Sequence, residues 1–176
     1  MRLLPVLTVV IASLLSVACS NPVPPAGVTV VSPFESQRFL GTWYEIARFD
    51  HHFESGLEKV TATYSLRGDG GIDVVNKGYN PERGIWQKTD GVAWFTGDPN
   101  RAALKISFFG PFYGGYNVIA LDKEYRHALV CGPDRDYLWL LARTPKISPQ
   151  VKQQMLDIAT RQGFEVSKLI WVNQRY

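Results

Sequence analysis

The sequence predicts an all-β protein: an eight-stranded antiparallel up-and-down β-barrel with one C-terminal α-helix packed outside. Between Gly41 and Arg143 the chain consists of short β-rich runs separated by Gly, Asp, Asn and Pro, which is typical of an antiparallel sandwich or barrel. One amphipathic helical pattern follows these runs. The length of 176 residues, with 45% hydrophobic residues, suits one substantial core and is too short for two ordinary domains.

Composition excludes several classes of function. The chain has 19 basic and 16 acidic residues, a formal net charge of +3 and no run of Lys or Arg, so no nucleic-acid partner is expected. Cys19 and Cys131 are too few for a disulfide framework or a zinc site. We expect no metal and no cofactor.

The first eighteen residues are expected to be a signal peptide, which is removed. Leu3 to Ala18 is uncharged and, at sixteen residues, is shorter than the roughly 20 that span a bilayer as a helix. The segment ending Leu15-Ser16-Val17-Ala18-Cys19 resembles a bacterial lipobox, which implies that Cys19 is acylated. Ser20 after this cysteine resembles the signal by which the lipoprotein sorting machinery delivers proteins to the outer membrane. The alternative is a plain secreted protein with a chance cysteine.

Removal of residues 1–18 would leave 158 residues, in two parts. Residues 19–33 are expected to form a lipid-anchored tether, because the stretch after Ser20 is polar and rich in proline. Residues 34–176 are assigned to the barrel domain, facing the periplasm.

Eight runs are expected to form the strands of the barrel. They are Trp43 to Phe49, Lys59 to Arg67, Ile72 to Tyr79, Gln87 to Phe95, Ala103 to Phe109, Tyr116 to Leu121, His127 to Cys131, and Tyr137 to Arg143. The links at 68–71, 97–100 and 122–125 are of hairpin size and carry turn residues. Such a barrel has room for one small ligand.

A helix is predicted to follow the strands. Ser148 is a suitable N-cap and Pro149 suits the first helical position, while Gly163 suits the C-terminal end. Val151, Met155, Ile158 and Ala159 fall on one face of this helix. Phe164 to Val172 is a candidate for a last short strand.

Three motifs resemble the signature of the lipocalins. Gly41-Thr42-Trp43-Tyr44 matches Gly-x-Trp, Asp122 to Tyr125 matches the Asp-x-x-Tyr turn, and Arg143 ends the last run where lipocalins keep an arginine. The resemblance covers about residues 34–172. Further features narrow the resemblance to bacterial outer-membrane lipocalins. They are Phe49, the segments Tyr64-Ser65-Leu66 and Asn76-Lys77-Gly78-Tyr79, and the lipobox.

The geometry of a meander places these three motifs at one end of the barrel. Successive turns alternate between the two ends, so Trp43 is expected to plug the end where Arg143 stacks on its ring. The links 50–58, 80–84, 110–115 and 132–136 then form the opposite end, the mouth.

Alternation along each strand predicts which side chains point into the lumen. With Trp43 inside, Glu45, Ala47 and Phe49 are expected inside, and Tyr44 and Ile46 outside against the helix. Strand parity and the lipocalin resemblance add Ala62, Tyr64, Leu66, Val74, Asn76, Phe95, Ile106, Phe108, Tyr116, Val118, Leu129, Cys131, Tyr137, Trp139 and Leu141. A mostly apolar, aromatic lining suits an elongated amphiphile. The alternative is an interior filled by these same side chains.

The mouth carries four aromatic residues in the Gly-rich segment 108–115, among them Tyr113. This surface is expected to clamp a lipid tail, to touch a membrane or to form a homodimer contact. Arg83, Arg135 and the His51-His52 pair are candidates for an anionic head group.

The expected function is storage or transport of a fatty acid, lysophospholipid or similar single-chain lipid at the outer membrane, with a role under envelope stress as a hypothesis. Expected ligand-binding residues are Phe49, Ala62, Tyr64, Val74, Asn76, Phe95, Ile106, Phe108, Tyr113, Tyr116, Val118, Cys131, Tyr137 and Trp139. No catalytic residue is assigned. Alternatives are thiol chemistry at Cys131, haem binding by His51 and His52, and a structural role, which predicts an occluded barrel.

Overall fold

The computed structural model describes residues 21–175. The predicted signal peptide, the acylation of Cys19 and the sorting role of Ser20 lie outside the described residues. No helix among residues 21–175 is long and apolar enough to cross a membrane.

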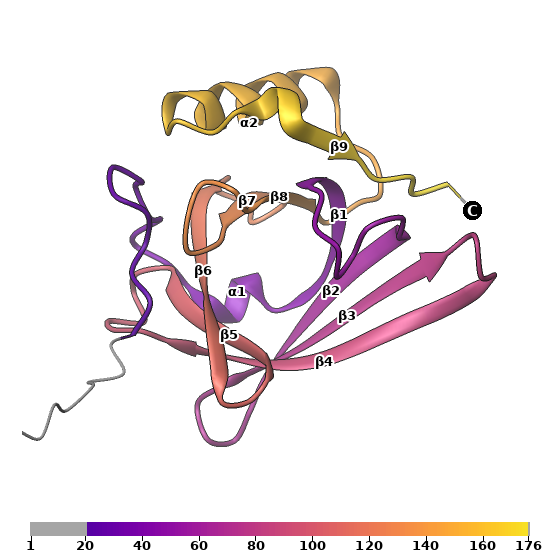
Figure 1. Ribbon diagram of the computed structural model, residues 1–176. Coiled ribbons are helices and arrows are strands. Elements are labelled where there is room, and N and C mark those ends of the chain that lie inside the picture. The colour runs from indigo at the N-terminus through magenta and orange to yellow at the C-terminus, as the bar shows by residue number, and fades with distance from the viewer. Residues whose placement is uncertain (1–20, 176) are drawn as a thin grey trace, which may run out of the picture.

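The strands form one closed antiparallel barrel (Figure 1). Their order is β2-β3-β4-β5-β6-β7-β8-β1-β9, and pairing of β1 with β2 closes the ring. The bounds are β1 Gly41–Phe49, β2 Glu58–Leu66, β3 Ile72–Asn80, β4 Ile85–Phe95, β5 Ala103–Phe109, β6 Phe112–Leu121, β7 His127–Cys131, β8 Leu138–Ala142 and β9 Leu169–Trp171. The predicted barrel of eight consecutive strands is confirmed.

Strand β6 begins at Phe112, four residues before the predicted start. Phe109 pairs with Phe112, so the expected loop is a tight hairpin. Gly114 and Gly115, which suggested a loop, lie inside strand β6. A Cβ on Gly115 would lie 3.2 Å from Pro133, so the close approach of the β7–β8 loop favours glycine there.

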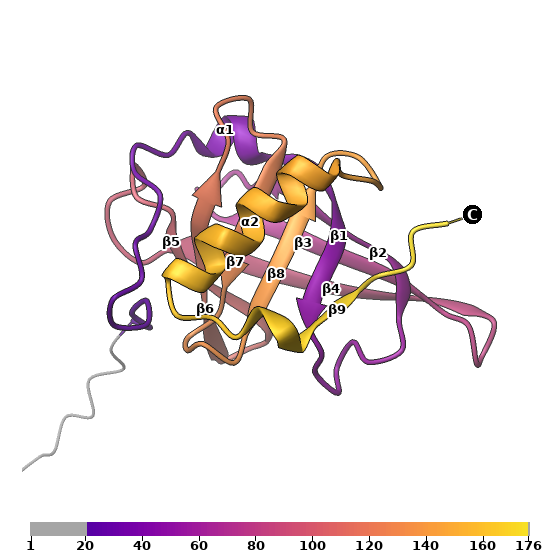
Figure 2. The ribbon, with the colours of Figure 1, turned by 90° about the horizontal axis from the view of Figure 1, so that it is seen from above.

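Helix α2, Pro149–Arg161, lies outside the barrel as predicted, and the view from above shows it crossing β7 and β8 (Figure 2). The Ser148 side chain accepts a hydrogen bond from the Val151 backbone N–H, and Gly163 has a φ of +89° just after the helix. Met155 and Ala159 are buried against the sheet. The late strand β9 is also present and pairs with β1.

The end of the barrel that carries the three motifs is closed by Trp43, as predicted. The Arg143 guanidinium lies 3.9 Å from the Trp43 ring centroid and donates hydrogen bonds to the carbonyls of Arg38, Thr42 and Tyr125. The Asp122 carboxylate accepts from the backbone N–H groups of Arg126 and His127. A short helix, α1 Ser36–Phe39, which the sequence did not predict, places Phe39 against Trp43.

Residues 21–33, expected to form a tether, pack along the barrel in the structure. The Val31 N–H donates to the Val118 carbonyl, and the Val31 carbonyl accepts from Ala102. Val30 belongs to the barrel core, which gives the segment an apolar contact as well. Asn21 is held by Lys105 and by the Thr96 carbonyl. The proline-rich composition did not reveal these contacts, because they are made with distant strands.

Apolar side chains form two clusters, which we call the inner cluster and the outer cluster. The inner cluster fills the lumen and includes Trp43, Tyr64, Val74, Val118 and Leu141. The outer cluster lies between α2 and the barrel wall and includes Ile46, with Tyr44 packed against it, as predicted.

Two register irregularities make part of the predicted lumen lining wrong. In β1 the pairing with β8 shifts between Glu45 and Ala47, so Ala47 and Phe49 join the outer cluster. In β6 the pairing with β7 shifts between Val118 and Ala120. Leu129 and Cys131 of β7 likewise lie in the outer cluster, and Ala128 and Val130 line the lumen instead.

Candidate functional site

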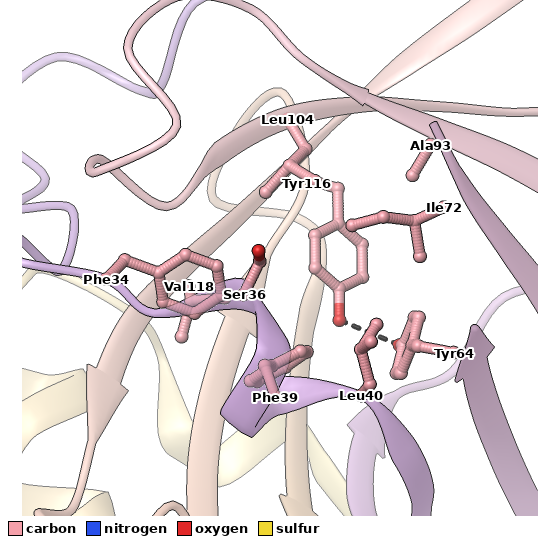
Figure 3. A pocket seen from close by; sticks show the side chains of 10 residues that line it. All are labelled: Phe34, Ser36, Phe39, Leu40, Tyr64, Ile72, Ala93, Leu104, Tyr116 and Val118. Atoms are coloured by element: carbon pink, nitrogen blue, oxygen red, sulfur yellow. Dashed lines mark hydrogen bonds between the residues drawn. The ribbon is translucent and has the colours of Figure 1, made fainter. Parts of the chain in front are cut away.

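The lumen contains a small cavity near its closed end (Figure 3). Its volume is about 10 Å³, which is room for about one water molecule. Its walls come from the segment before β1 and from strands β2 to β6: Phe34, Ser36, Phe39, Leu40, Tyr64, Ile72, Ala93, Leu104, Tyr116 and Val118. The closed half of the lumen is therefore apolar and almost filled by its own side chains.

Two tyrosine hydroxyls meet in this cavity. Tyr64 on β2 and Tyr116 on β6 point toward each other, with their oxygens 2.7 Å apart (Figure 3). Burial raises the pKa of both hydroxyls, so both stay protonated. One hydroxyl donates to the other, which leaves the second proton available for a polar group of a ligand.

The mouth half of the lumen holds a buried group of charges centred on Arg48. Because β1 is bulged, Arg48 points inward, directly opposite Trp139 of β8 in the register. The guanidinium lies 2.9 Å from a carboxylate oxygen of Glu45 and 3.0 Å from one of Asp50. Arg48 also donates to the backbone carbonyls of Glu54 and Leu57, in the loop between β1 and β2. This arginine thus ties that loop across the mouth.

Glu54 completes the group. Its carboxylate accepts a hydrogen bond of 2.9 Å from the Trp139 Nε1–H and lies 3.9 Å from Arg48 Nε. Burial raises the pKa of Glu54, while the Trp139 hydrogen bond and the charge of Arg48 oppose that rise. A buried charge that loses a hydrogen-bond or ion-pair partner costs free energy, so each of these contacts stabilises the group.

Glu45 gives the protein a pH-dependent stability. Burial, and next the charge of Glu54, raise the pKa of Glu45 from 4.5 to about 8. The folded protein therefore keeps a proton on Glu45 between about pH 5 and pH 8, where the unfolded chain has lost it. Since the folded state binds more protons in this window, this group makes stability fall as the pH rises through it.

We expect Glu45→Gln to flatten the stability profile between pH 5.5 and 8.5. The difference amounts to several kcal/mol at most, since each pKa unit is worth about 1.4 kcal/mol. Urea unfolding of both proteins at the two pH values measures it. Glu82→Gln, at an exposed turn, serves as the charge-matched control. Parallel profiles for Glu45→Gln and the parent protein would contradict the assignment.

Most of the other predicted ligand-binding side chains do line the lumen. The inner cluster, with the side chains packed against it, contains Ala62, Tyr64, Val74, Phe95, Ile106, Phe108, Tyr116, Val118 and Trp139. Asn76 lies opposite Ala62 in the register. Tyr137 precedes β8 and stacks on His51 at the mouth, 4.1 Å between ring centroids. Their roles in ligand binding stay predictions.

Four expected side chains at the wall and ends of the barrel lie elsewhere. Phe49 and Cys131 face helix α2, as described above. Tyr113 lies on the outer face, where the Lys105 ammonium is 5.0 Å from its ring centroid. Leu66 is 52% exposed at the end of β2.

The head-group candidates named from the sequence are also placed by the structure. Arg135 donates to the carbonyls of Ala26 and Gln162, outside the barrel. His51 Nε2 hydrogen-bonds the Asp136 carbonyl. Arg83 lies in the exposed turn between β3 and β4.

Sequence reasoning missed Arg48 and Glu54. A signal for Arg48 was present: within the apolar first strand the two charged residues, Glu45 and Arg48, are three apart. A regular strand puts residues three apart on opposite faces, so an ion pair at this spacing indicates a bulge. Nothing in the sequence distinguishes Glu54 from the other polar residues of its loop.

Comparison with known proteins gives matches to a family model and to individual proteins. A family model described as a lipocalin-like domain matches residues 34–174. The chain is 75% identical over 174 residues to outer membrane lipoprotein Blc of Citrobacter freundii, covering 99% of this chain and 98% of that protein. It is 36% identical over 152 residues to temperature-induced lipocalin-1 of Arabidopsis thaliana, covering 80% and 79% of the two chains.

A solved structure shows the same fold. Insecticyanin from the tobacco hornworm Manduca sexta matches with a TM-score of 0.69 at 20% identity, covering 87% of each chain.

Proposed function

The chain belongs to the lipocalin family, and on that premise we propose that it binds a single-chain amphiphile, a fatty acid or lysophospholipid, inside its barrel. The observation that carries the proposal is the lining of the lumen. Apolar and aromatic side chains run from Trp43 to the mouth, and polar groups occur at two depths, the tyrosine pair and the Arg48 group. A few placed polar groups within an apolar lining are typical of sites for amphiphilic ligands.

The proposed place of action is the periplasmic side of the outer membrane. The relatives from Citrobacter freundii and Escherichia coli, both named outer membrane lipoproteins, support this location. In this proposal residues 1–18 are removed as a signal, Cys19 is acylated, and the lipoprotein sorting machinery delivers the protein. Because Asn21 is fixed to Lys105, two residues after the anchor, the barrel would be held close to the lipid surface.

Catalysis by Cys131 finds no support in its surroundings. The thiol lies in the outer cluster, away from the lumen, and burial raises its pKa to about 12. A thiol in this state is a poor nucleophile at neutral pH. We therefore propose a binding protein rather than an enzyme.

Haem binding by the adjacent histidines is also disfavoured. His51 is engaged at the mouth, because its Nε2 hydrogen-bonds the Asp136 carbonyl and its ring stacks on Tyr137.

A structural role predicts an occluded barrel, the closed half of the lumen is nearly filled, and a binding experiment separates the two functions. We expect Ala93→Leu to weaken saturable binding of a fluorescent fatty acid to delipidated protein by at least fivefold. Ala93 lines the cavity, and a larger side chain takes up the space that a lipid tail needs.

Val92→Leu is the matched control, because Val92 is the adjacent residue of β4 and faces the other side of the wall. Its affinity should stay within twofold of the parent protein. Absence of saturable binding by the parent protein would favour the structural role. Equal affinities for the parent and Ala93→Leu proteins would place the ligand outside the barrel.

A further inference from the structure

The loop between β1 and β2, residues 50–57, sends one side chain into the barrel. Within these eight residues Glu54 alone is buried, whereas the neighbouring Phe53 is 57% exposed. A loop that turns its carboxylate inward and its aromatic ring outward reverses the usual preference. The contacts of Glu54 inside the barrel must therefore explain its position.

Those contacts form a receptor for a carboxylate. The Trp139 Nε1–H donates to Glu54 Oε1 at 2.9 Å, and the same oxygen lies 3.9 Å from Arg48 Nε. Arg48 and Trp139 are partners on the neighbouring strands β1 and β8, so the rigid wall holds both of them. A cation and an N–H donor at the mouth of an apolar lumen are the groups that recognise the anionic head of an amphiphile.

The loop also occupies space that such a ligand needs. The closed half of the lumen retains a cavity of about 10 Å³, against the roughly 300 Å³ or more of a typical ligand pocket, so a ligand needs the mouth half as well. Besides the Glu54 carboxylate, the loop is held by hydrogen bonds of Arg48 with the Glu54 and Leu57 carbonyls, of Ser55 with Asp50 and of His51 with the Asp136 carbonyl, and by stacking of His51 on Tyr137. Its release breaks these contacts as well as those of the Glu54 carboxylate. An incoming carboxylate replaces the carboxylate contacts with Trp139 and Arg48.

We propose that Glu54 is an internal stand-in for the ligand head group, and that a fatty-acid carboxylate displaces it from Trp139 and Arg48 as the loop swings out of the mouth. This inference rests on the proposed function and adds the chemical class of the head group and the residue that competes with it. The loop then acts as an autoinhibitory lid whose release requires an anion.

The test compares laurate with dodecanol, which has the same chain and an uncharged head, by calorimetric titration of delipidated protein. Glu54→Ala is expected to bind laurate at least tenfold more tightly than the parent protein, because the competing carboxylate is gone. Trp139→Phe is expected to weaken laurate binding at least fivefold and dodecanol binding less than twofold. Glu82→Ala, an exposed carboxylate at the same end, is the control and should change neither affinity.

Glu54→Gln covers the case in which Glu54→Ala does not fold, because it keeps the size of the side chain and removes its charge. It should also bind laurate more tightly, by a smaller factor. Unchanged or weaker laurate binding by a folded Glu54 variant would overturn the inference while leaving the proposed function intact. If neither laurate nor dodecanol binds to the parent protein or to any variant, the proposed function is overturned and the inference with it.

Discussion

At pH 9, where Glu45 is ionised, Arg48→Met is expected to lower the free energy of unfolding by about 3–5 kcal/mol, the loss typical of breaking a buried ion pair from one side. Arg48 is 1% exposed and contacts Glu45, Asp50 and two carbonyls of the β1–β2 loop. Its removal leaves the Glu45 carboxylate and the Glu54 carbonyl buried without their donor, and the partly exposed Asp50 loses its ion-pair partner. Urea unfolding monitored by circular dichroism measures the loss.

Arg67→Met is the control for this substitution. Arg67 also forms two ion pairs, with Asp69 and Asp73, but they lie at the surface. Surface pairs contribute about 0–1 kcal/mol each, so this variant should lose far less stability. Equal losses for the two variants would show that Arg48 is not the centre of a buried charge group.

Trp43→Ala is expected to cost about 3–5 kcal/mol, the range for removal of a large aromatic side chain from a core. Trp43 is fully buried, donates a 2.8 Å hydrogen bond to the Phe39 carbonyl and carries Arg143 on its ring. Its loss opens a cavity at the closed end and removes a cation–π contact. Denaturant unfolding at constant pH measures the change.

Trp86→Ala is the matched control, since Trp86 is 53% exposed near the β3–β4 turn. Its effect should stay below about 1 kcal/mol, as for most surface substitutions. A loss as large as that of Trp43→Ala would mean that the closed end contributes no more to stability than the exposed rim.

Local patterns in the sequence were sufficient to predict the architecture of the barrel. Alternating apolar runs and turn residues marked the strands, Ser148 and Pro149 marked the start of α2, and counting turns brought Trp43 and Arg143 to one end. These features depend on neighbours in the chain and on the simple connectivity of a meander. They therefore predicted strand order, helix position and the plugged end.

Local patterns failed where the backbone departs from regular alternation. One residue inserted in β1 turned Ala47 and Phe49 outward and Arg48 inward, and a second irregularity in the β6–β7 pairing accompanied the outward placement of Cys131. Similarly, packing of residues 21–33 on the barrel depends on partners such as Val118 and Ala102, far along the chain.

Residue patterns alone are enough to predict a lipocalin barrel with an apolar lumen, one outer helix and a closed end. The side chains that occupy the mouth follow from the way the strands pair in three dimensions. A bulge shifts every later side chain of its strand to the other face, and its position depends on pairing between strands. The burial of Arg48 and Glu54 follows from that pairing, because their charges are tolerated only where β1, β8 and the β1–β2 loop supply partners together.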